Sequence, residues 1–411
     1  MSIIKIPTIL MPKKNVNMEK WAIIACDQFT SQPEYWEKLN SLVGDAPSTL
    51  RLVFPEVYLE KDNNPIIDSI NLNMKKYLEE GVLESIGECM VLIDRKTPYQ
   101  KRRLGLVLAV DLDAYSYKAS DKAMIRATEQ TVIERIPPRV RIRKNALIEL
   151  PHILLLINDK KQTIIENLYN KKDQFEKIYD FDLNMDGGHV TGYKIVNCKE
   201  IIKSFEELIS KQTIKENNWD SNNIMQFVVG DGNHSLATAK THWDNLKKTL
   251  NEKEVVNHPA RYALVEVMNI FDEGLVFEPI HRVVFNPDND FYEGFKKVCK
   301  GDFECILYKT GVAEKILLPS NAAIAVKEVQ EYIDDYIKNH PNTKVDYVHG
   351  LYDMKQVCDN NINSIGITLP PLNKVDLFNY VVNCGSLPRK TFSMGHANEK
   401  RYYIESKMIV K

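Results

Sequence analysis

Short runs of apolar residues recur along the chain and predict buried β-strands. Their length and their content of β-branched side chains favour strands over helices. The expected strands cover residues 22–26, 90–93, 104–110, 153–157, 227–229 and 262–268. Longer stretches with apolar residues at helical spacing predict helices at 162–169, 199–212, 236–247, 290–299 and 326–339. Strands interleaved with helices, without one regular alternation, indicate an α/β or α+β fold with mixed sheets.

The domain organisation is less sharply marked, because no Gly/Ser-rich linker divides the chain. The polar stretch 215–224 is the most loop-like segment in the middle. We therefore expect an N-terminal mixed α/β domain over residues 1–215 and a C-terminal α/β domain over residues 216–411. The chain shows no internal repeat, which argues against solenoids and propellers.

Composition and charge exclude several classes of protein. The 411 residues carry 54 Lys+Arg and 56 Asp+Glu, a formal net charge of −2, and 44% of them are hydrophobic. This near balance argues against a protein that mainly coats nucleic acid or an anionic membrane. The 7 cysteines show no CxxC spacing, which indicates reduced thiols in a cytoplasm. Since no apolar run approaches the ~18 residues of a membrane span, we expect a cytoplasmic protein with no membrane anchor.

The segment most informative about chemistry is 227–240, where a strand, a tight turn and a helix follow one another. Its glycine and polar residues are Gly230, Asp231, Gly232, Asn233 and His234. The N–H groups at the start of a helix attract anions, and two glycines let a phosphate approach the backbone. Asp231 could hold a divalent cation, while Asn233 and His234 could donate to phosphate oxygens. The alternative is a plain turn and helix cap.

A second glycine-rich segment carries three carboxylates and an imidazole: Asp180, Asp182, Asp186 and His189. Such a group could bind Mg²⁺ or orient a substrate amine, with Asp186 and His189 as the substrate residues. The sequence Asp-Gly-Gly is also a common hairpin turn, so a hairpin flanked by solvated carboxylates is the alternative.

An arginine-rich segment lies at 125–143. The prolines at 137–138 predict the end of a helix, so that Arg139, Arg141 and Arg143 would alternate along a strand and share one face. Like charges in a row predict a polyphosphate or a row of carboxylates opposite them. A solvated edge strand is the alternative.

Three further candidates come from other parts of the chain. Arg389 belongs to a basic, glycine-bounded stretch that could contact phosphate or form a surface loop. Asp27 follows a predicted strand and is either functional or, as we prefer, the N-cap of the next helix. Glu129 lies one predicted helical turn from Arg126, and the two could form a surface ion pair.

Taken together, these segments resemble a bacterial and archaeal family catalogued as domain-of-unknown-function family 1015. The motifs that carry the resemblance are IRATE at 125–129, RIPPRVRIR at 135–143, DGGH at 186–189, GDGNHSLATA at 230–239, EPIHRVV at 278–284 and LPRKTFSMGHA at 387–397. They cover nearly the whole chain.

The turn at 231–234 is also similar to the Asp-Gly-His-His-Arg signature of the ParB/sulfiredoxin-like superfamily, which includes free L-serine kinases. The resemblance implies a ParB/sulfiredoxin-like element whose turn contacts nucleotide phosphates, and a carboxylate elsewhere that deprotonates the substrate hydroxyl. This chain departs from the signature, with Asn233 in place of the first His and Ser235 in place of the Arg. The arginines of 139–143 or Arg389 would have to replace the missing phosphate contact.

The leading hypothesis is therefore a nucleotide-dependent small-molecule kinase that phosphorylates free L-serine or a related hydroxylated metabolite, using Mg²⁺ and ATP or ADP. The expected phosphate-binding residues are Gly230, Gly232, Asn233, Arg139, Arg141, Arg143 and Arg389. The expected catalytic residues are Glu129, Asp27 and His234, with Asp231 for the metal and Asp186 and His189 for the substrate. The alternatives are a non-catalytic, nucleotide-binding ParB-like regulatory protein and a metal-dependent hydrolase that uses residues 180–189. A nucleic-acid partner is not expected.

Overall fold

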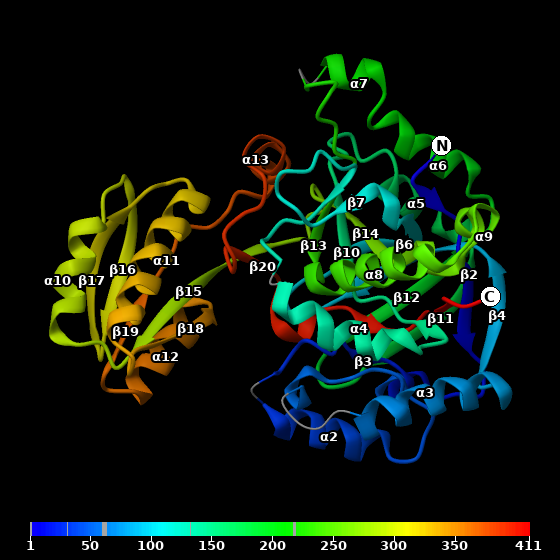
Figure 1. The fold of residues 1–411 in the computed structure, drawn as a ribbon, viewed down its shortest axis with the longest axis horizontal. Coiled ribbons are helices and arrows are strands. Elements are labelled where there is room, and N and C mark those ends of the chain that lie inside the picture. The colour runs from blue at the N-terminus through cyan, green and yellow to red at the C-terminus, as the bar shows by residue number, and fades with distance from the viewer. Residues whose placement is uncertain (1, 31, 60–63, 132, 217–218) are drawn as a thin grey trace. The chain divides into compact units, whose positions relative to one another are not determined.

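The computed structural model describes residues 2–30, 32–59, 64–131, 133–216 and 219–411. The chain divides into two compact units, the first formed by Met1–Leu275 with Ala397–Lys411 and the second by Val276–His396 (Figure 1). Both units combine helices with β-sheets, so the predicted mixed α/β fold is confirmed. The boundary expected at 215/216 falls inside the first unit.

A large mixed sheet forms the centre of the first unit. Its strands run in the order β11-β12-β5-β6-β14-β10-β13-β8-β7, and β1 pairs with β6. Their bounds are β1 Ile4–Lys5, β5 Met90–Lys96, β6 Arg103–Asp111, β7 Tyr115–Ser116, β8 Ile125–Arg126, β10 Leu154–Ile157, β11 Glu176–Leu183, β12 Gly188–Ile195, β13 Phe227–Asp231 and β14 Tyr262–Asn269. Because every residue of β6 is buried, this strand lies at the centre of the core. All six predicted strands form, five of them in this sheet and the sixth as β3 (Ile23–Ile24).

Three two-stranded sheets complete the first unit. They pair β2 (Thr8–Pro12) with β4 (Leu83–Glu88), β3 with β21 (Tyr402–Tyr403), and β9 (Ile148–Glu149) with β22 (Lys407–Met408). Tyr402 faces Ile24 and Lys407 faces Glu149 in these pairs. The last residues of the chain are thereby held against its first strands and against the segment that precedes β10.

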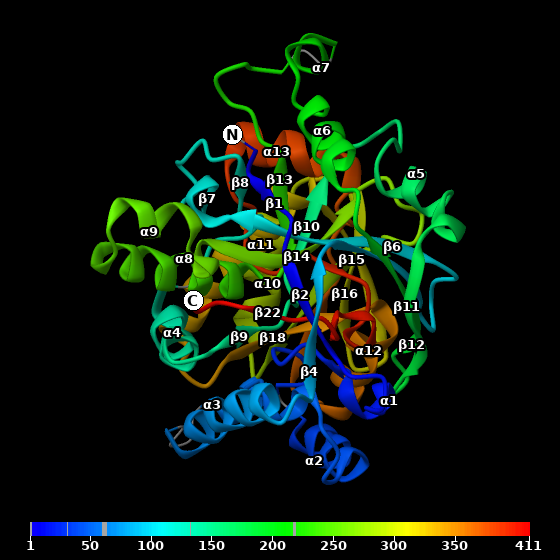
Figure 2. The same ribbon diagram turned by 90° about the vertical axis from the view of Figure 1, so that its right-hand side faces the viewer.

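Helices surround the sheet of the first unit. Their bounds are α1 Met18–Trp21, α2 Pro33–Val43, α3 Asn64–Glu79, α4 Ile136–Lys144, α5 Ile165–Tyr169, α6 Lys199–Glu207, α7 Lys211–Glu216, α8 Asn233–Leu246 and α9 Glu252–Asn257. Helices α2 and α3 lie at one end of the unit, and α6 and α7 lie at the opposite end (Figure 1 and Figure 2). Helix α8 buries Leu236, Ala239 and Trp243 in the core, as its predicted helical spacing requires.

The second unit has its own sheet and its own core. Its strand order is β17-β16-β19-β15-β18, with β20 pairing to β15. The bounds are β15 Phe277–Phe285, β16 Phe303–Lys309, β17 Val312–Leu318, β18 Lys344–His349, β19 Ser364–Ile367 and β20 Phe392–Met394, with α10 Asn289–Val298, α11 Ala322–Asn339, α12 Leu351–Asn360 and α13 Leu377–Cys384. One apolar cluster packs Phe291 and Phe295 of α10 against Val326 and Ile333 of α11.

The expectation for the arginine-rich segment was wrong. The prolines at 137–138 lie in the first turn of α4, where a missing N–H costs nothing because that turn leaves its N–H groups unpaired. Arg139, Arg141 and Arg143 are therefore on a helix rather than a strand. At helical spacing, Arg139 and Arg143 share a face, whereas Arg141 points elsewhere and is exposed.

The cysteines and the lengths of the helices bear on two of the expectations from the sequence. All 7 cysteines are free, as predicted for reduced thiols. Within the described part of the chain, every helix is too short or too polar to cross a membrane.

Candidate functional site

The turn between β13 and α8 has the predicted form. Gly232 precedes the helix with a φ of 80°, and a Cβ added there would lie 3.0 Å from the Cα of Ile153. Glycine is therefore required by both conformation and space. The Leu236 N–H donates to the Gly232 carbonyl at 3.0 Å. The N–H groups of the first helical turn point toward the space before α8.

A side-chain link joins the start of α8 to the segment after β8. The Asn233 Oδ1 accepts from the Thr128 N–H at 3.2 Å, and the Asn233 Nδ2 donates to the Thr128 Oγ1 at 3.1 Å. The Thr128 hydroxyl in turn donates to the Val229 carbonyl at 2.6 Å. Because Glu129 follows Thr128 directly, this link holds the backbone of Glu129 beside the start of α8.

Asp231, the last residue of β13, forms an ion pair with Lys400. The Lys400 Nζ lies 3.0 Å from the Asp231 Oδ2, and the two side chains are 8% and 27% exposed. The other oxygen, Oδ1, accepts from the Gly232 N–H at 2.9 Å. Burial raises the pKa of Asp231, but Lys400 outweighs it, so the net effect is a lowered pKa. Asp231 is therefore ionised at neutral pH.

His152 connects α8 to both ends of the chain. Its Nε2 lies 2.6 Å from the Oγ of Ser235, and its Nδ1 lies 2.9 Å from the Tyr403 hydroxyl. That hydroxyl donates to the Cys26 sulfur at 3.1 Å and accepts from the Cys26 N–H at 3.2 Å. Burial raises the pKa of both Cys26 and Tyr403, so the thiol and the phenol stay protonated. Asp27 completes the group, with its Oδ2 4.0 Å from the His152 Nε2.

A second carboxylate adjoins Asp27. The Glu56 N–H donates to the Cys26 carbonyl at 2.8 Å, and the Arg139 Nε donates to the Glu56 Oε1 at 2.8 Å. Burial and the nearby charge of Asp27 raise the pKa of Glu56, while Arg139 opposes the shift. Glu56 therefore releases its proton less readily than an exposed glutamate.

A cavity of about 160 Å³, partly open to solvent, adjoins His152. Its polar lining residues are Cys26, Glu56, Arg139, Arg143, Glu149, His152, Ser235, Thr238 and Tyr403. Its apolar lining residues are Leu52, Val53, Phe54, Leu59, Met74, Ile142, Ala146, Ile148, Leu150, Ile153 and Leu264. All of these residues, together with Asp27, Asp231 and Lys400, belong to the first compact unit.

Comparison with models of known protein families identifies the family of this chain. A family model described as "Protein of unknown function (DUF1015)" matches residues 9–406. The chain belongs to this family. A comparison with curated proteins finds no match. The ParB/sulfiredoxin-like signature at 231–234 stays a prediction.

Two solved structures show what the fold of this DUF1015 member is similar to. A free serine kinase in complex with AMP aligns with 72% of this chain and 90% of its own length, at 10% identity and a TM-score of 0.40. A conserved hypothetical protein from Pyrococcus furiosus aligns with 74% of this chain and 95% of its own, at 11% identity and a TM-score of 0.37.

The second glycine-rich segment is a hairpin, formed by β11 and β12. His189 lies between two carboxylates, with Nε2 2.7 Å from the Asp180 Oδ1 and Nδ1 2.7 Å from the Asp182 Oδ1. Asp186 occupies the turn with a φ of 60°. Burial opposes the protonation of His189, but the two carboxylates outweigh it and raise the pKa. The hairpin alternative is thus confirmed, and the described residues contain no group of three or more His, Cys, Asp or Glu that could hold a metal ion.

Other predicted site residues lie apart from this group. Arg126 is buried in β8, where its Nε donates to the Ala123 carbonyl at 2.8 Å, so the expected surface ion pair with Glu129 was wrong. Asp27 lies in a turn, and α2 has Gln32 as its N-cap residue, so the expected cap was wrong as well.

Three arginines that were predicted to bind phosphate either lie in the second unit or pair with carboxylates of the protein. Arg389 belongs to the second unit and is exposed. Arg143 on α4 pairs with Glu149, to which Lys407 also lies 3.3 Å away. Arg139 and Arg143 therefore face carboxylates of the protein itself, one of the two neighbours that the arginine-rich pattern predicted.

Sequence reasoning missed His152, Lys400 and Tyr403. His152 directly precedes the apolar run 153–157, and a polar residue at a strand end was the one local signal that could have found it. Lys400 and Tyr403 lie more than a hundred residues beyond the glycine turn, so no local pattern connects them with it.

Proposed function

We propose that this chain is a nucleotide-dependent phosphotransferase that phosphorylates a hydroxyl group of a small molecule, with free L-serine among the acceptors to be tested. The observation that carries the proposal is the convergence, near the start of α8, of the glycine turn and first turn of the helix, the buried cation Lys400, and the carboxylate of Asp27 beside His152. Phosphoryl transfer depends mainly on positioning and on charge neutralisation, and this arrangement supplies both.

The phosphate of the nucleotide would bind at the turn 230–233. The positive end of the α8 dipole and the N–H groups of its first turn attract an oxyanion, and glycine allows close approach. Lys400 would add a positive charge from the β13 side, replacing the Arg that the signature has and this chain lacks. Asn233 would act through its backbone, because its side chain is engaged with Thr128. His234, in the first turn of α8, would donate to the transferred group.

The acceptor hydroxyl would bind beside Asp27. The carboxylate of Asp27 is 4.0 Å from the imidazole of His152, which itself contacts Ser235 in the first turn of α8. Asp27 and Ser235 approach the same nitrogen of His152, so the Asp27 carboxylate lies near the first turn of α8. This is a suitable position for a base that accepts the proton of the hydroxyl. Glu129 is the second candidate for this base, on the other side of the link through Thr128.

The residues at the turn do not fit a dedicated metal site. One oxygen of Asp231 accepts from the Gly232 N–H and the other pairs with Lys400, so both oxygens already have partners. Mg²⁺ is commonly held by one or two carboxylates together with the phosphates of a substrate. We therefore assign Asp231 to Lys400 rather than to the metal, and Mg²⁺ would enter with the nucleotide.

Incubation of the purified protein with ATP or ADP, L-serine and a panel of other hydroxylated metabolites tests the proposal. We expect ³¹P NMR to show a phosphomonoester whose formation requires an acceptor. Asp27→Asn should reduce its rate by about 10²–10⁴-fold, and Glu129→Gln is the matched control. If Glu129→Gln rather than Asp27→Asn abolishes turnover, Glu129 is the base. The absence of product with either nucleotide would contradict the proposal.

The two alternative functions give different results in the same samples. A non-catalytic nucleotide-binding protein would gain thermal stability with nucleotide and release no product. Its DNA-binding form would retain DNA on a filter at low salt. A metal-dependent hydrolase would cleave generic phosphate esters with added Mg²⁺ or Mn²⁺, and His189→Gln would remove that activity.

A further inference from the structure

The cavity beside His152 is lined mainly by apolar side chains. Leu52, Phe54, Met74 and Ile148 are each at most 5% exposed, so they form a buried apolar wall on the inner side of this partly open cavity. Its volume of about 160 Å³ matches an engineered apolar cavity of about 150 Å³ that binds benzene. Apolar side chains that face such a space gain contacts when an apolar group fills it.

The charged residues around the cavity neutralise one another. Glu56 is paired with Arg139, and Glu149 is paired with both Arg143 and Lys407. An ionic ligand entering here would have to break one of these pairs and leave a charge unpaired in a buried place, which is costly. The paired charges of the lining therefore favour an uncharged ligand.

The polar end of the cavity is the proposed transfer site. His152, Ser235 and Tyr403 line it, and the carboxylate of Asp27 lies 4.0 Å from the His152 Nε2. A ligand whose apolar body fills the cavity would thus present a hydroxyl to the imidazole and to the start of α8.

We infer that the cavity binds the apolar part of the phosphoryl acceptor, and that this acceptor is an uncharged alcohol with an apolar group of about six carbon atoms next to its hydroxyl. The phosphorylation of the hydroxyl rests on the proposed function, whereas the binding of the alcohol in the cavity is independent of it. L-Serine has no apolar group to fill the cavity and carries two charges that would have to remain outside it. It is therefore expected to be a poorer acceptor than a benzyl or cyclohexyl alcohol.

The binding experiment uses 4-fluorobenzyl alcohol and the full chain, followed by ¹⁹F NMR. We expect saturable line broadening that benzyl alcohol reverses and that equimolar glycerol does not. Ala146→Leu places a larger side chain in the lining and should weaken binding at least tenfold. The control is Ala313→Leu, the same change at an exposed position of β17 in the second unit.

A second variant and a second readout keep the outcomes separate. Met74→Ala enlarges the cavity, so it should shift the preference toward 2-phenylethanol, and circular dichroism confirms that each variant is folded. If the fluorinated alcohol does not bind to the folded wild-type chain, or if both leucine variants weaken binding equally, the inference is wrong. Phosphorylation of L-serine by the same sample would then leave the proposed function standing. Binding without product from either nucleotide would leave the cavity site standing and contradict the proposed function.

Discussion

At the scale of the residue, Asp231 contacts both the backbone of the glycine turn and the side chain of Lys400. One of its oxygens accepts from the Gly232 N–H and the other pairs with Lys400. Lys400 is only 8% exposed, and this carboxylate compensates the charge of its ammonium group. The charge of Asp231 is therefore needed for stability as well as for any role in catalysis.

Asp231→Asn should lower the free energy of unfolding by about 1–3 kcal/mol, because it removes a carboxylate that compensates the Lys400 charge in a largely buried place. The 27% exposure of Asp231 keeps the cost below that of a fully buried pair. Lys400→Met in the same chain removes that charge and should restore part of the loss. Urea unfolding of the single and double variants measures the coupling. The exposed pair Lys315–Glu304 is the control, and Lys315→Met should change stability by less than about 0.5 kcal/mol. Purely additive effects at 231 and 400 would contradict the expectation.

His281 makes the stability of the second unit depend on pH. The side chain is 5% exposed, its Nδ1 accepts from the Leu369 N–H at 3.2 Å, and burial lowers its pKa to about 4. The unfolded chain has a His pKa near 6.5, so it binds the proton first as the pH falls. Stability is therefore complete above about pH 6.5 and should decline toward pH 4 by up to about 3 kcal/mol.

Urea unfolding at pH 7 and pH 4.5 checks this expectation. His281→Gln keeps an acceptor for the Leu369 N–H but does not titrate, so its stability should fall less between the two pH values. An equal fall in the variant and in the wild-type chain would assign the pH dependence to other groups.

At the scale of the element, the pattern of apolar residues predicted strands and helices more reliably than the positions of proline did. The strands at 104–110 and 262–268 were predictable because a strand buried on both faces is a continuous apolar run. Helix α8 was predictable because a glycine turn precedes a helical repeat. Helix α4 was not predictable, because a pair of prolines can either follow the end of a helix or lie in the first turn of one. The ring geometry is the same in both cases, so the surrounding structure decides which one forms.

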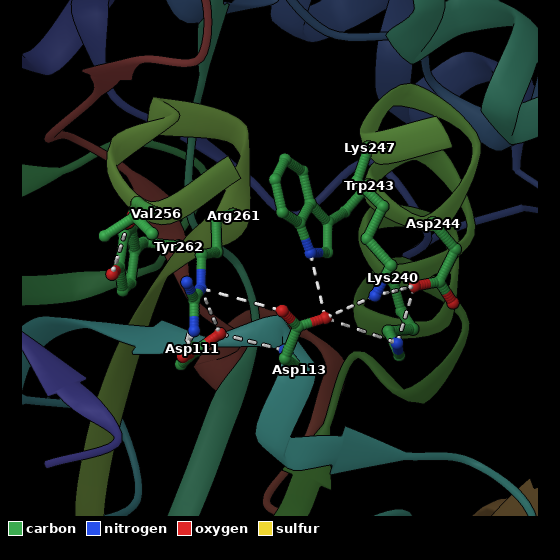
Figure 3. A network of polar contacts seen from close by, with 9 residues as sticks. All are labelled: Asp111, Asp113, Lys240, Trp243, Asp244, Lys247, Val256, Arg261 and Tyr262. Carbon is green, nitrogen blue, oxygen red and sulfur yellow. Dashed lines mark hydrogen bonds and ion pairs between the residues drawn. The ribbon is translucent and has the colours of Figure 1, made fainter. Parts of the chain in front are cut away.

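Helix α8 carries the proposed site at its first turn. Its other end is anchored by Asp113, in the turn that follows β6 (Figure 3). The Asp113 Oδ1 accepts from the Trp243 Nε1 at 3.0 Å and from the Lys247 Nζ at 2.7 Å. Burial alone would raise the pKa of Asp113, but these hydrogen bonds outweigh it and lower the pKa. The carboxylate therefore remains ionised and available to both donors.

Asp113→Ala should lower stability by about 1–3 kcal/mol, because it leaves the buried indole N–H of Trp243 without its acceptor. Hydrogen exchange followed by mass spectrometry should show faster exchange in α8 than in the other helices of the first unit. Asp121→Ala is the control, since that exposed carboxylate bonds with Ser116 and Ser120 of its own loop. Unchanged exchange in α8 of the Asp113 variant would show that core packing alone holds the helix.

At the scale of the whole molecule, the candidate site is assembled from distant parts of one unit. Asp27 follows β3, His152 precedes β10, and Lys400 precedes β21, whose residue Tyr402 pairs with Ile24. Such pairings close very long loops and are specified by packing over the whole unit rather than by any local window. This is why the glycine turn could be predicted from the sequence, whereas its partners His152 and Lys400 could not.

The two compact units have separate apolar cores. We therefore predict that a core substitution in one unit destabilises that unit and leaves the stability of the other unchanged. Phe295 in α10 is fully buried, with its ring centroid 5.9 Å from that of Phe291, and Phe295→Ala should cost the second unit about 3–5 kcal/mol. Hydrogen exchange should then rise within 276–396, while nucleotide affinity, which we assign to the first unit, stays unchanged. Phe227→Ala, at a fully buried position of β13, is the matched control and should produce the opposite pattern. If each variant instead speeds exchange along the entire chain, the units unfold as one cooperative body, and a substitution in the second unit would then reach the site through global stability alone.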